Sequence, residues 1–231
     1  GPSRGIADYL AEDVLARLPE TQRNFVITSS MFDTFCPSMC DAVFERDDSS
    51  ELIEQTHRDN LFLQIIDADG SWYRYHPLFR DFLRTQIPSL TNSGNKTREW
   101  HLKAAKWLDS AGRGLQAIDH AIAGNSPELA AELMTARATD FVRTGQFGLV
   151  SHWIELLSKE VLSQHPSLAI AGAYAMVFLH RYKDATTLLA QIEPIAAGIR
   201  EPAHDLLVLR VMLGAWSDDL PKAMETAVNA L

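Results

Sequence analysis

The sequence predicts a mainly α-helical protein with one β-hairpin, and three observations support that class. Apolar residues recur at helical spacing over most of the 231 residues. Only residues 60–76 differ, with two short apolar and aromatic runs joined by a turn signal at 67–70. After residue 96 the sequence shows no convincing strand pattern. We therefore expect short helices, then one hairpin, then a long all-helical region.

Composition narrows the class of protein further. Hydrophobic residues make up 46% and charged residues 22%, which predicts buried cores rather than disorder. The net charge of −9 argues against duplex DNA binding by this segment, because such binding needs clustered cations. No apolar run is long enough to cross a membrane. The two cysteines, Cys36 and Cys40, lie one helical turn apart, which favours buried core thiols and a reducing, cytoplasmic setting.

The first part of the chain is predicted to contain short helices around the hairpin. Asp48 and Glu51 have capping-box spacing and predict a helix start, and Pro77 suits the first position of the helix after the hairpin. Residues 87–96 are polar and rich in breakers, so we place a domain boundary after residue 90. The helices expected in this part are 6–18, 20–30, 37–44, 48–59 and 77–86. This order of elements indicates a small winged-helix domain over residues 1–90.

The second domain, residues 91–231, is expected to be a superhelix of α-helical hairpins. A polar turn followed by charged, small and apolar residues recurs, and Ala185 and Ala223 lie 38 residues apart, near the tetratricopeptide (TPR) period. Such an array is TPR-like and presents a concave binding face. The helices expected here are 97–111, 115–123, 126–143, 146–157, 167–180, 183–198, 202–215 and 220–231.

Few residue patterns point to chemistry. The sequence has no phosphate-binding loop and no nucleophile elbow, and its eight histidines show no metal-ligand spacing, so we expect neither an enzyme nor a metal site. Asp67 and Asp69 are explained by turn chemistry. Tyr174, Phe178 and Tyr182 recur every four residues. They could line the concave face as a ligand or partner surface, or they could be a buried helix face.

Several segments together resemble MalT-like, LuxR-type bacterial transcription activators, which are signal-transducing ATPases with numerous domains. The match is closest over residues 9–83 and looser beyond. It includes the junction 72–76, Trp-Tyr-Arg-Tyr-His, although Pro77 stands where the family often has a second histidine. The other matching segments are 9–15, 25–30, 40–43, 60–63, 117–121 and 165–168.

The resemblance implies a role for His76. In this family the winged-helix histidine reaches the terminal phosphate of bound ADP and holds the resting state closed; the alternative is a histidine that ends a strand and caps a local carbonyl. The implied nucleotide-binding domain and the C-terminal helix-turn-helix are not in this sequence. We therefore expect an internal fragment that binds no cofactor by itself, whereas the intact protein would bind ATP or ADP and hydrolyse ATP slowly.

We interpret the chain as a regulatory and signal-sensing part of such an activator, coupling nucleotide state and inducer binding to activation. Its expected partners are the nucleotide-binding domain and a small-molecule or protein inducer. DNA would be contacted only through the helix-turn-helix. The apolar stripe of 220–231 predicts a weak homo-oligomer. A protein–protein scaffold without a nucleotide-linked role is the alternative, and an enzyme without a recognisable motif is a third possibility.

Overall fold

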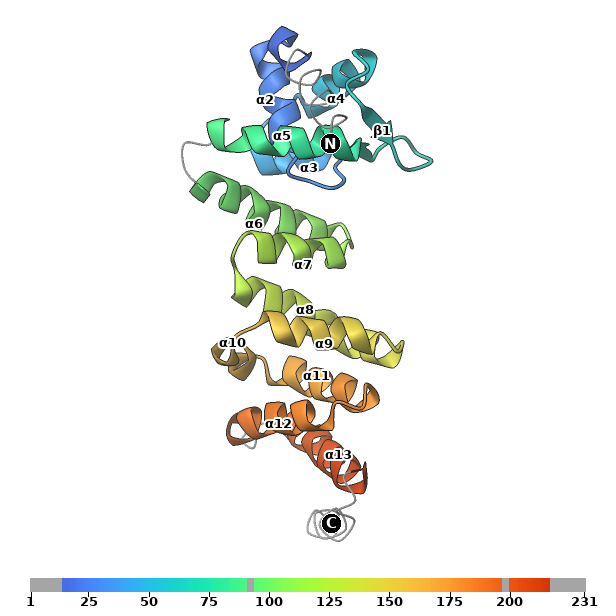
Figure 1. Cartoon of the computed structure of the whole chain (residues 1–231), viewed down its shortest axis with the longest axis vertical. Coiled ribbons are helices and arrows are strands. Elements are labelled where there is room, and N and C mark those ends of the chain that lie inside the picture. Colours follow the sequence, from blue (N-terminus) through green and yellow to red (C-terminus); the bar gives the residue numbers. More distant parts are fainter. Residues whose placement is uncertain (1–13, 91–93, 197–199, 217–231) are drawn as a thin grey trace, which may run out of the picture. The chain divides into compact units, whose positions relative to one another are not determined.

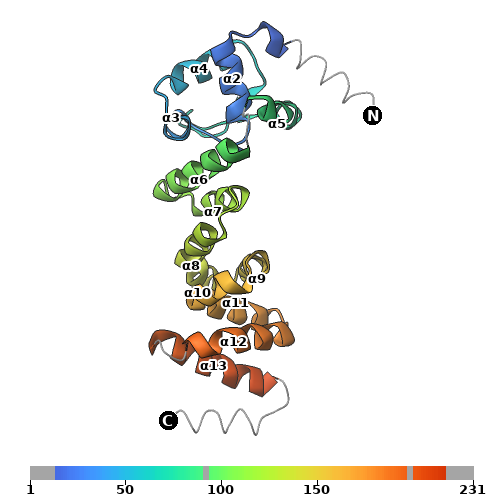
Figure 2. The same cartoon turned by 90° about the vertical axis from the view of Figure 1, so that its left-hand side faces the viewer.

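The computed structural model describes residues 14–90, 94–196 and 200–216, shown in Figure 1 and, turned by 90°, in Figure 2. It divides into two units, Gly1–Asn125 and Ser126–Leu231. The first unit therefore extends past residue 90, where the sequence predicts a domain boundary. Of the first predicted helix, 6–18, only the last residues are described, and 14–17 are helical.

Three short helices precede the hairpin: α2 (Glu20–Ser29), α3 (Pro37–Phe44) and α4 (Ser49–Arg58). Their bounds agree with the prediction to within a residue at each end. Asp48 is the N-cap residue of α4, as the sequence predicts, but its carboxylate makes no capping hydrogen bond and accepts from Arg46 Nε at 2.6 Å. Asp41 Oδ1 instead accepts the N–H of Ser49 at 3.1 Å. A carboxylate beside an arginine is drawn to that stronger donor rather than to a backbone amide.

The hairpin pairs β1 (Leu63–Ile65) with β2 (Tyr73–Tyr75) in antiparallel register, with Leu63 opposite Tyr75. The predicted turn forms through Asp67, whose carboxylate accepts from the backbone N–H groups of Ser71 and Trp72. On its other side β2 pairs with Phe35 through two backbone hydrogen bonds of 2.9 and 2.8 Å. The hairpin is thereby tied to the segment between α2 and α3.

Helix α5 (Pro77–Leu90) begins at the predicted proline but runs past the predicted end at residue 86 and contains Pro88. Its buried face, Phe79, Leu83 and Ile87, repeats every four residues and packs on α2. A proline inside a helix removes one backbone hydrogen bond and introduces a steric clash with the preceding turn. Here Pro88 lies within the last turn, and the burial of Ile87 holds that turn in place.

Helices α6 (Gly94–Ser110) and α7 (Gly114–Ala123) form a helical hairpin within the first unit. Gly112 makes the turn with φ of +75°, a conformation that favours glycine. The hairpin packs on α3, where the ring of Trp100 meets that of Phe44 edge to face at 5.1 Å. The winged helix and the α6–α7 hairpin therefore share one hydrophobic core.

In the second unit, the described residues 126–196 and 200–216 form helices and no strand. The predicted helices appear as α8 (Pro127–Arg143), α9 (Phe147–Leu156), α11 (Pro166–Phe178), α12 (Tyr182–Ala196) and α13 (Arg200–Trp216). The sequence analysis assigned no element to α10 (Lys159–Gln164). Ser158 caps it by accepting from the N–H of Val161, a signal that a search for N-caps would have found.

Helix α11 is the centre of this unit. It packs against α8, α9, α12 and α13, and most of its residues are buried, as expected of a helix that is apolar all round. The described part of the chain is thus mainly α-helical, a winged-helix domain with one hairpin followed by TPR-like helical hairpins, and the predicted fold class is confirmed. The predicted helix 220–231, with Ala223 and the expected dimer stripe, lies outside the described residues.

Candidate functional site

His76, the predicted nucleotide contact, lies between β2 and α5. The backbone N–H of His76 donates to the carbonyl of Phe62 at 2.8 Å, and the backbone carbonyl of His76 accepts from the backbone N–H of Arg80 at 2.9 Å. Strand alternation buries Tyr75, whose hydroxyl lies 2.9 Å from Ser29 Oγ, and leaves His76 exposed. Within the described residues the imidazole makes no hydrogen bond. The backbone of His76 is thus fixed and its side chain is open to solvent.

Apolar side chains are exposed around this junction. Phe62, whose backbone pairs with His76, is 52% exposed, and Leu78 is 58% exposed. Phe62 has a φ of +53°, which is uncommon for a side chain of this kind, and its ring lies 5.2 Å from that of Phe79. Exposed apolar side chains beside a fixed polar group are typical of a surface that another domain or ligand covers.

The second predicted site, Tyr174, Phe178 and Tyr182, does not form one continuous stripe. Tyr174 and Phe178 belong to α11, which ends at Phe178, and Tyr182 is the first residue of α12. The turn passes through His180 at φ +59°, and His180 Nδ1 lies 2.6 Å from the Tyr182 hydroxyl. Phe178 remains largely exposed. Its ring stacks on Phe147 of α9 with centroids 4.6 Å apart. Whether these residues bind a partner stays a prediction.

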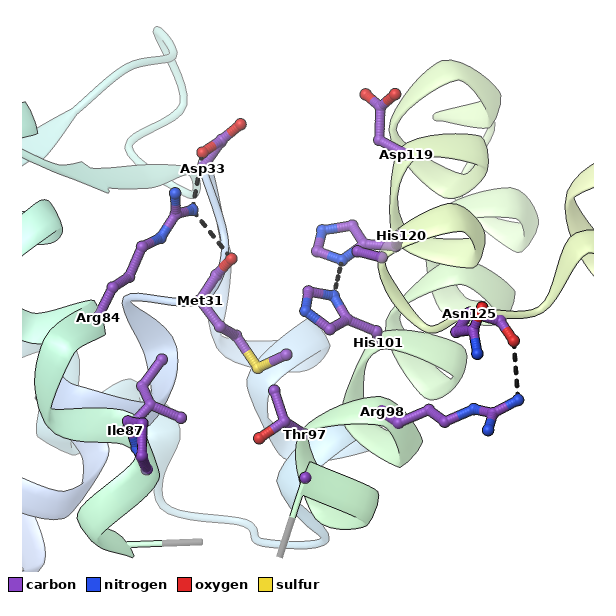
Figure 3. A pocket seen from close by; sticks show the side chains of 13 residues that line it. Met31, Asp33, Arg84, Ile87, Thr97, Arg98, His101, Asp119, His120 and Asn125 are labelled. Atoms are coloured by element: carbon purple, nitrogen blue, oxygen red, sulfur yellow. Dashed lines mark hydrogen bonds and ion pairs between the residues drawn. The ribbon is translucent and has the colours of Figure 1, made fainter. Parts of the chain in front are cut away.

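A cavity of about 800 Å³ in the first unit was not predicted (Figure 3). It lies between the end of α5 and the α6–α7 hairpin. Met31, Ile87 and Ala123 contribute apolar walls. The polar lining residues are Asp33, Arg84, Thr97, Arg98, His101, Asp119, His120 and Asn125.

Two histidines meet in this cavity. His101 Nδ1 of α6 lies 2.8 Å from His120 Nδ1 of α7, and the rings are 5.0 Å apart between centroids. Figure 3 shows the other ring nitrogen of each, Nε2, directed into the cavity toward the side where Arg84 and Met31 lie. His101 lies 11 residues before Gly112, at the turn of the hairpin, and His120 lies 8 residues after it. Residues at comparable distances on either side of the turn can meet in an antiparallel helical hairpin, and this spacing was the one sequence signal for the histidine pair.

Both imidazoles have a lowered pKa. For His101 the main cause is burial, with a smaller contribution from the Arg84 guanidinium. For His120 burial, His101 and Arg84 together lower the pKa to about 4, although Asp33 opposes them. Desolvation penalises the charged form of a base, so the pair is neutral near neutral pH.

Arg84 ties α5 to the end of α2. It donates to the carbonyl oxygens of Ser30 and Met31 at 2.9 and 3.0 Å and to Asp33 Oδ1 at 2.9 Å. Arg80 also donates to Asp33 Oδ1, at 2.7 Å. On the opposite wall Arg98 donates to the carbonyls of Gly124 and Asn125, which end α7. Arg84 and Arg98 thus donate hydrogen bonds to carbonyl groups at the C-terminal ends of α2 and α7, at the edge of the cavity.

The cysteines are buried, as the sequence predicts. Cys36 and Cys40 are buried free thiols, and burial raises the pKa of Cys40. Among the described residues no group of three or more histidine, cysteine or acidic side chains could hold a metal ion. In the same residues no helix is long and apolar enough to cross a membrane.

Comparison with known proteins identifies relatives. A family model described as the MalT winged helix domain matches residues 11–93. Two relatives named HTH-type transcriptional regulator MalT come from Klebsiella pneumoniae strain 342 and K. pneumoniae subsp. pneumoniae strain ATCC 700721 / MGH 78578. Each is 30% identical over 228 residues, covering 98% of this chain and 25% of the relative. The chain thus spans about a quarter of the length of these curated relatives.

One solved structure has a similar fold. It is a signal transduction ATPase with numerous domains (STAND) protein with a tetratricopeptide repeat sensor, from Pyrococcus horikoshii. The TM-score is 0.62 at 20% sequence identity, and the match covers 95% of this chain and 32% of that one. At this identity the likeness concerns the fold alone.

Proposed function

We propose that this chain is the regulatory segment of a transcription activator, because residues 11–93 match the MalT winged helix domain model and nearly the whole chain is similar to MalT. In this proposal the winged helix holds a nucleotide-binding domain in its resting state. The helical hairpins that follow receive a small-molecule or protein signal. DNA is contacted elsewhere in the intact protein, consistent with the net charge of −9 here.

The observation that carries the proposal is the exposed imidazole of His76 at the β2–α5 junction. Its backbone is held on both sides by hydrogen bonds, so the ring is presented from a fixed position. An imidazole N–H can donate to a phosphate oxygen, and the exposed apolar side chains of Phe62 and Leu78 lie where a second domain could pack. We propose that His76 contacts the terminal phosphate of ADP bound to that domain.

The experiment is His76→Ala in the intact activator, with ADP retention and basal transcription as readouts. A hydrogen bond to a charged group contributes about 1.5–3 kcal/mol, so ADP should dissociate on the order of ten-fold or more faster. Basal activation should rise with it. His57→Ala, which removes an exposed histidine of α4, is the matched control and should change neither quantity.

Unchanged ADP retention in His76→Ala, with the protein folded, would show that the histidine only ends a strand. If no substitution in the winged helix changed the response of the intact protein to nucleotide, the alternative of a protein–protein scaffold would be favoured. Full-length sequence would supply an independent check, because the proposal requires a phosphate-binding loop and a basic helix-turn-helix.

A further inference from the structure

The cavity between α5 and the α6–α7 hairpin is lined by two arginines and a pair of histidines, side chains that can donate to a small oxyanion. We propose that it binds the carboxylate or phosphate group of a small molecule and that the His101–His120 pair takes up one proton as the anion binds. This site is separate from His76, and it stands whether or not His76 contacts a nucleotide. Its volume of about 800 Å³ is within the range of small-molecule pockets.

The Nδ1···Nδ1 contact of 2.8 Å fixes what the two rings offer to a ligand. When both imidazoles are neutral, one ring donates from Nδ1 and the other accepts there. The donating ring then presents a bare Nε2 to the cavity, and the accepting ring presents Nε2–H. The neutral pair therefore offers one donor and one acceptor.

Adding one proton changes this face without breaking the pair. The proton enters at the bare Nε2 of His101 or His120, whichever ring donates from Nδ1, and the Nδ1–H···Nδ1 bond remains. Both Nε2 atoms are then N–H donors directed into the cavity, and the pair carries one positive charge. Two donors and a positive charge are what a carboxylate or phosphate group binds best. In the neutral pair, the lone pair on the bare Nε2 would instead repel such an oxygen.

Before the proton is added, the charges around the cavity balance one another. From α5, Arg84 and Arg80 both pair with the Asp33 carboxylate, and Arg80 also pairs with Asp81 at 3.7 Å, so the charges on that wall balance. From α6, Arg98 has its Nε and Nη2 on carbonyls, and from α7 the exposed Asp119 contributes a carboxylate. The lining side chains Asp33, Arg84, Arg98 and Asp119 sum to zero net charge, so the proton taken up by the histidine pair would supply the excess positive charge of the cavity.

Burial explains why proton and anion would bind together. Desolvation is the largest cause of the lowered pKa of both His101 and His120, and the neighbouring Arg84 lowers each further. An anion beside Arg84 and the pair would offset both effects and so favour the charged pair. Linkage then requires that anion affinity rises as pH falls, by up to about ten-fold per pH unit when one proton is taken up.

Calorimetric titration of the 231-residue chain with sulfate and with oxalate tests this proposal. Sulfate stands for a phosphate group and oxalate for a carboxylate, and neither changes protonation between about pH 6 and pH 8. Titrations in two buffers with different ionisation enthalpies count the protons taken up. The anion that binds with the higher affinity, sulfate or oxalate, shows whether the site prefers a phosphate group or a carboxylate.

Two variants test the pair directly. In His101→Asn and His120→Asn the amide lies near the former Nδ1, but no atom remains at Nε2 and the side chain cannot be protonated. Each should lower anion affinity on the order of ten-fold or more, and the double variant, in which neither imidazole remains to take up a proton, should also abolish its pH dependence. His57→Asn on α4 is the matched control and should bind as the unchanged chain does. The pH dependence of the unchanged chain tests the proposal even if a variant fails to fold.

The supporting result is saturable binding of at least one anion, stronger at low pH and with one proton taken up, that is weaker in each single variant and loses its pH dependence in the double variant. Absence of saturable binding near pH 6 would overturn the proposal. Binding with no proton uptake, or binding that both asparagine variants retain, would overturn it equally. Failure of this experiment would leave the effect of His76→Ala on ADP retention unchanged, so the two proposals fail separately.

Discussion

His101 Nδ1 lies 2.8 Å from His120 Nδ1, which joins α6 to α7 by a hydrogen bond between two largely buried imidazoles. The His120 ring also meets the buried ring of Phe32 edge to face at 5.4 Å. The pair therefore connects the first helical hairpin to the core of the winged helix. Its protonation should affect the stability of the first unit as well as the cavity.

Acid should destabilise the first unit through this pair. The pKa of His120 falls from 6.5 to about 4 on folding, so between these values the unfolded chain binds a proton that the folded chain does not. Stability is therefore greatest above pH 6.5 and declines as pH falls toward 4, by up to about 3 kcal/mol for one such group. Denaturant unfolding in chloride buffers at several pH values measures the decline.

His120→Asn should make that decline shallower, because the titrating group is gone. His57→Asn, which replaces an exposed histidine of α4, should leave the wild-type pH dependence in place. Parallel pH dependences for the unchanged chain and His120→Asn would show that the destabilisation by acid comes from other groups.

Gly172→Ala should destabilise the second unit. A Cβ at this position of α11 would overlap Ile154 of α9, approaching its Cδ1 to 2.6 Å and its Cγ1 still more closely. Overpacking of this kind typically costs about 1–3 kcal/mol, more than the roughly 1 kcal/mol that alanine gains over glycine in a helix. Thermal unfolding followed by circular dichroism should show the lower melting temperature.

Two further variants isolate the cause. Gly148→Ala, in α9, meets nothing within 4 Å and should be neutral or slightly stabilising. In an Ile154→Ala background the added methyl has room, so Gly172→Ala should then cost little. An equal cost of Gly172→Ala in both backgrounds would contradict the steric explanation.

Tyr75→Phe should cost about 1 kcal/mol of unfolding free energy, because it removes the hydrogen bond between the buried Tyr75 hydroxyl and Ser29 Oγ. The loss is limited, since Ser29 Oγ still donates to the carbonyl of Phe25 at 2.7 Å. A double-mutant cycle with Ser29→Ala should give a coupling energy of the same size. Additive effects of the two substitutions would show that the hydroxyls do not stabilise each other.

Arg84→Met should destabilise the first unit more than Asp33→Asn does. The Asp33 side chain is 76% exposed, and ion pairs at such positions contribute about 0–1 kcal/mol. Arg84 also donates to two carbonyls at the end of α2, which lose those donors in the variant. Chemical denaturation of the two variants gives the comparison, and equal losses would mean that the ion pair provides most of the effect.

The sequence by itself determined the elements that depend on local patterns. Helix α3 has the predicted bounds 37–44, because Pro37 starts it and its apolar spacing is regular. The turn at Asp67 and the start of α5 at Pro77 follow from residue-specific backbone preferences. The exposed position of His76 follows from the strand alternation that buries Tyr75. The expected contact of His76 with ADP came from the family resemblance and is not tested by this structure.

Tertiary structure alone decided the features that depend on residues far apart in the chain. Helix α5 continues through Pro88 because the burial of Ile87 outweighs a local break signal. The Asp48 carboxylate makes no capping hydrogen bond because Arg46 is a stronger partner. The spacing of Tyr174, Phe178 and Tyr182 suggested one stripe, but a turn separates the last from the others. His101 and His120 meet only when α6 folds back on α7, because hydrogen bonding and desolvation act between neighbours in space.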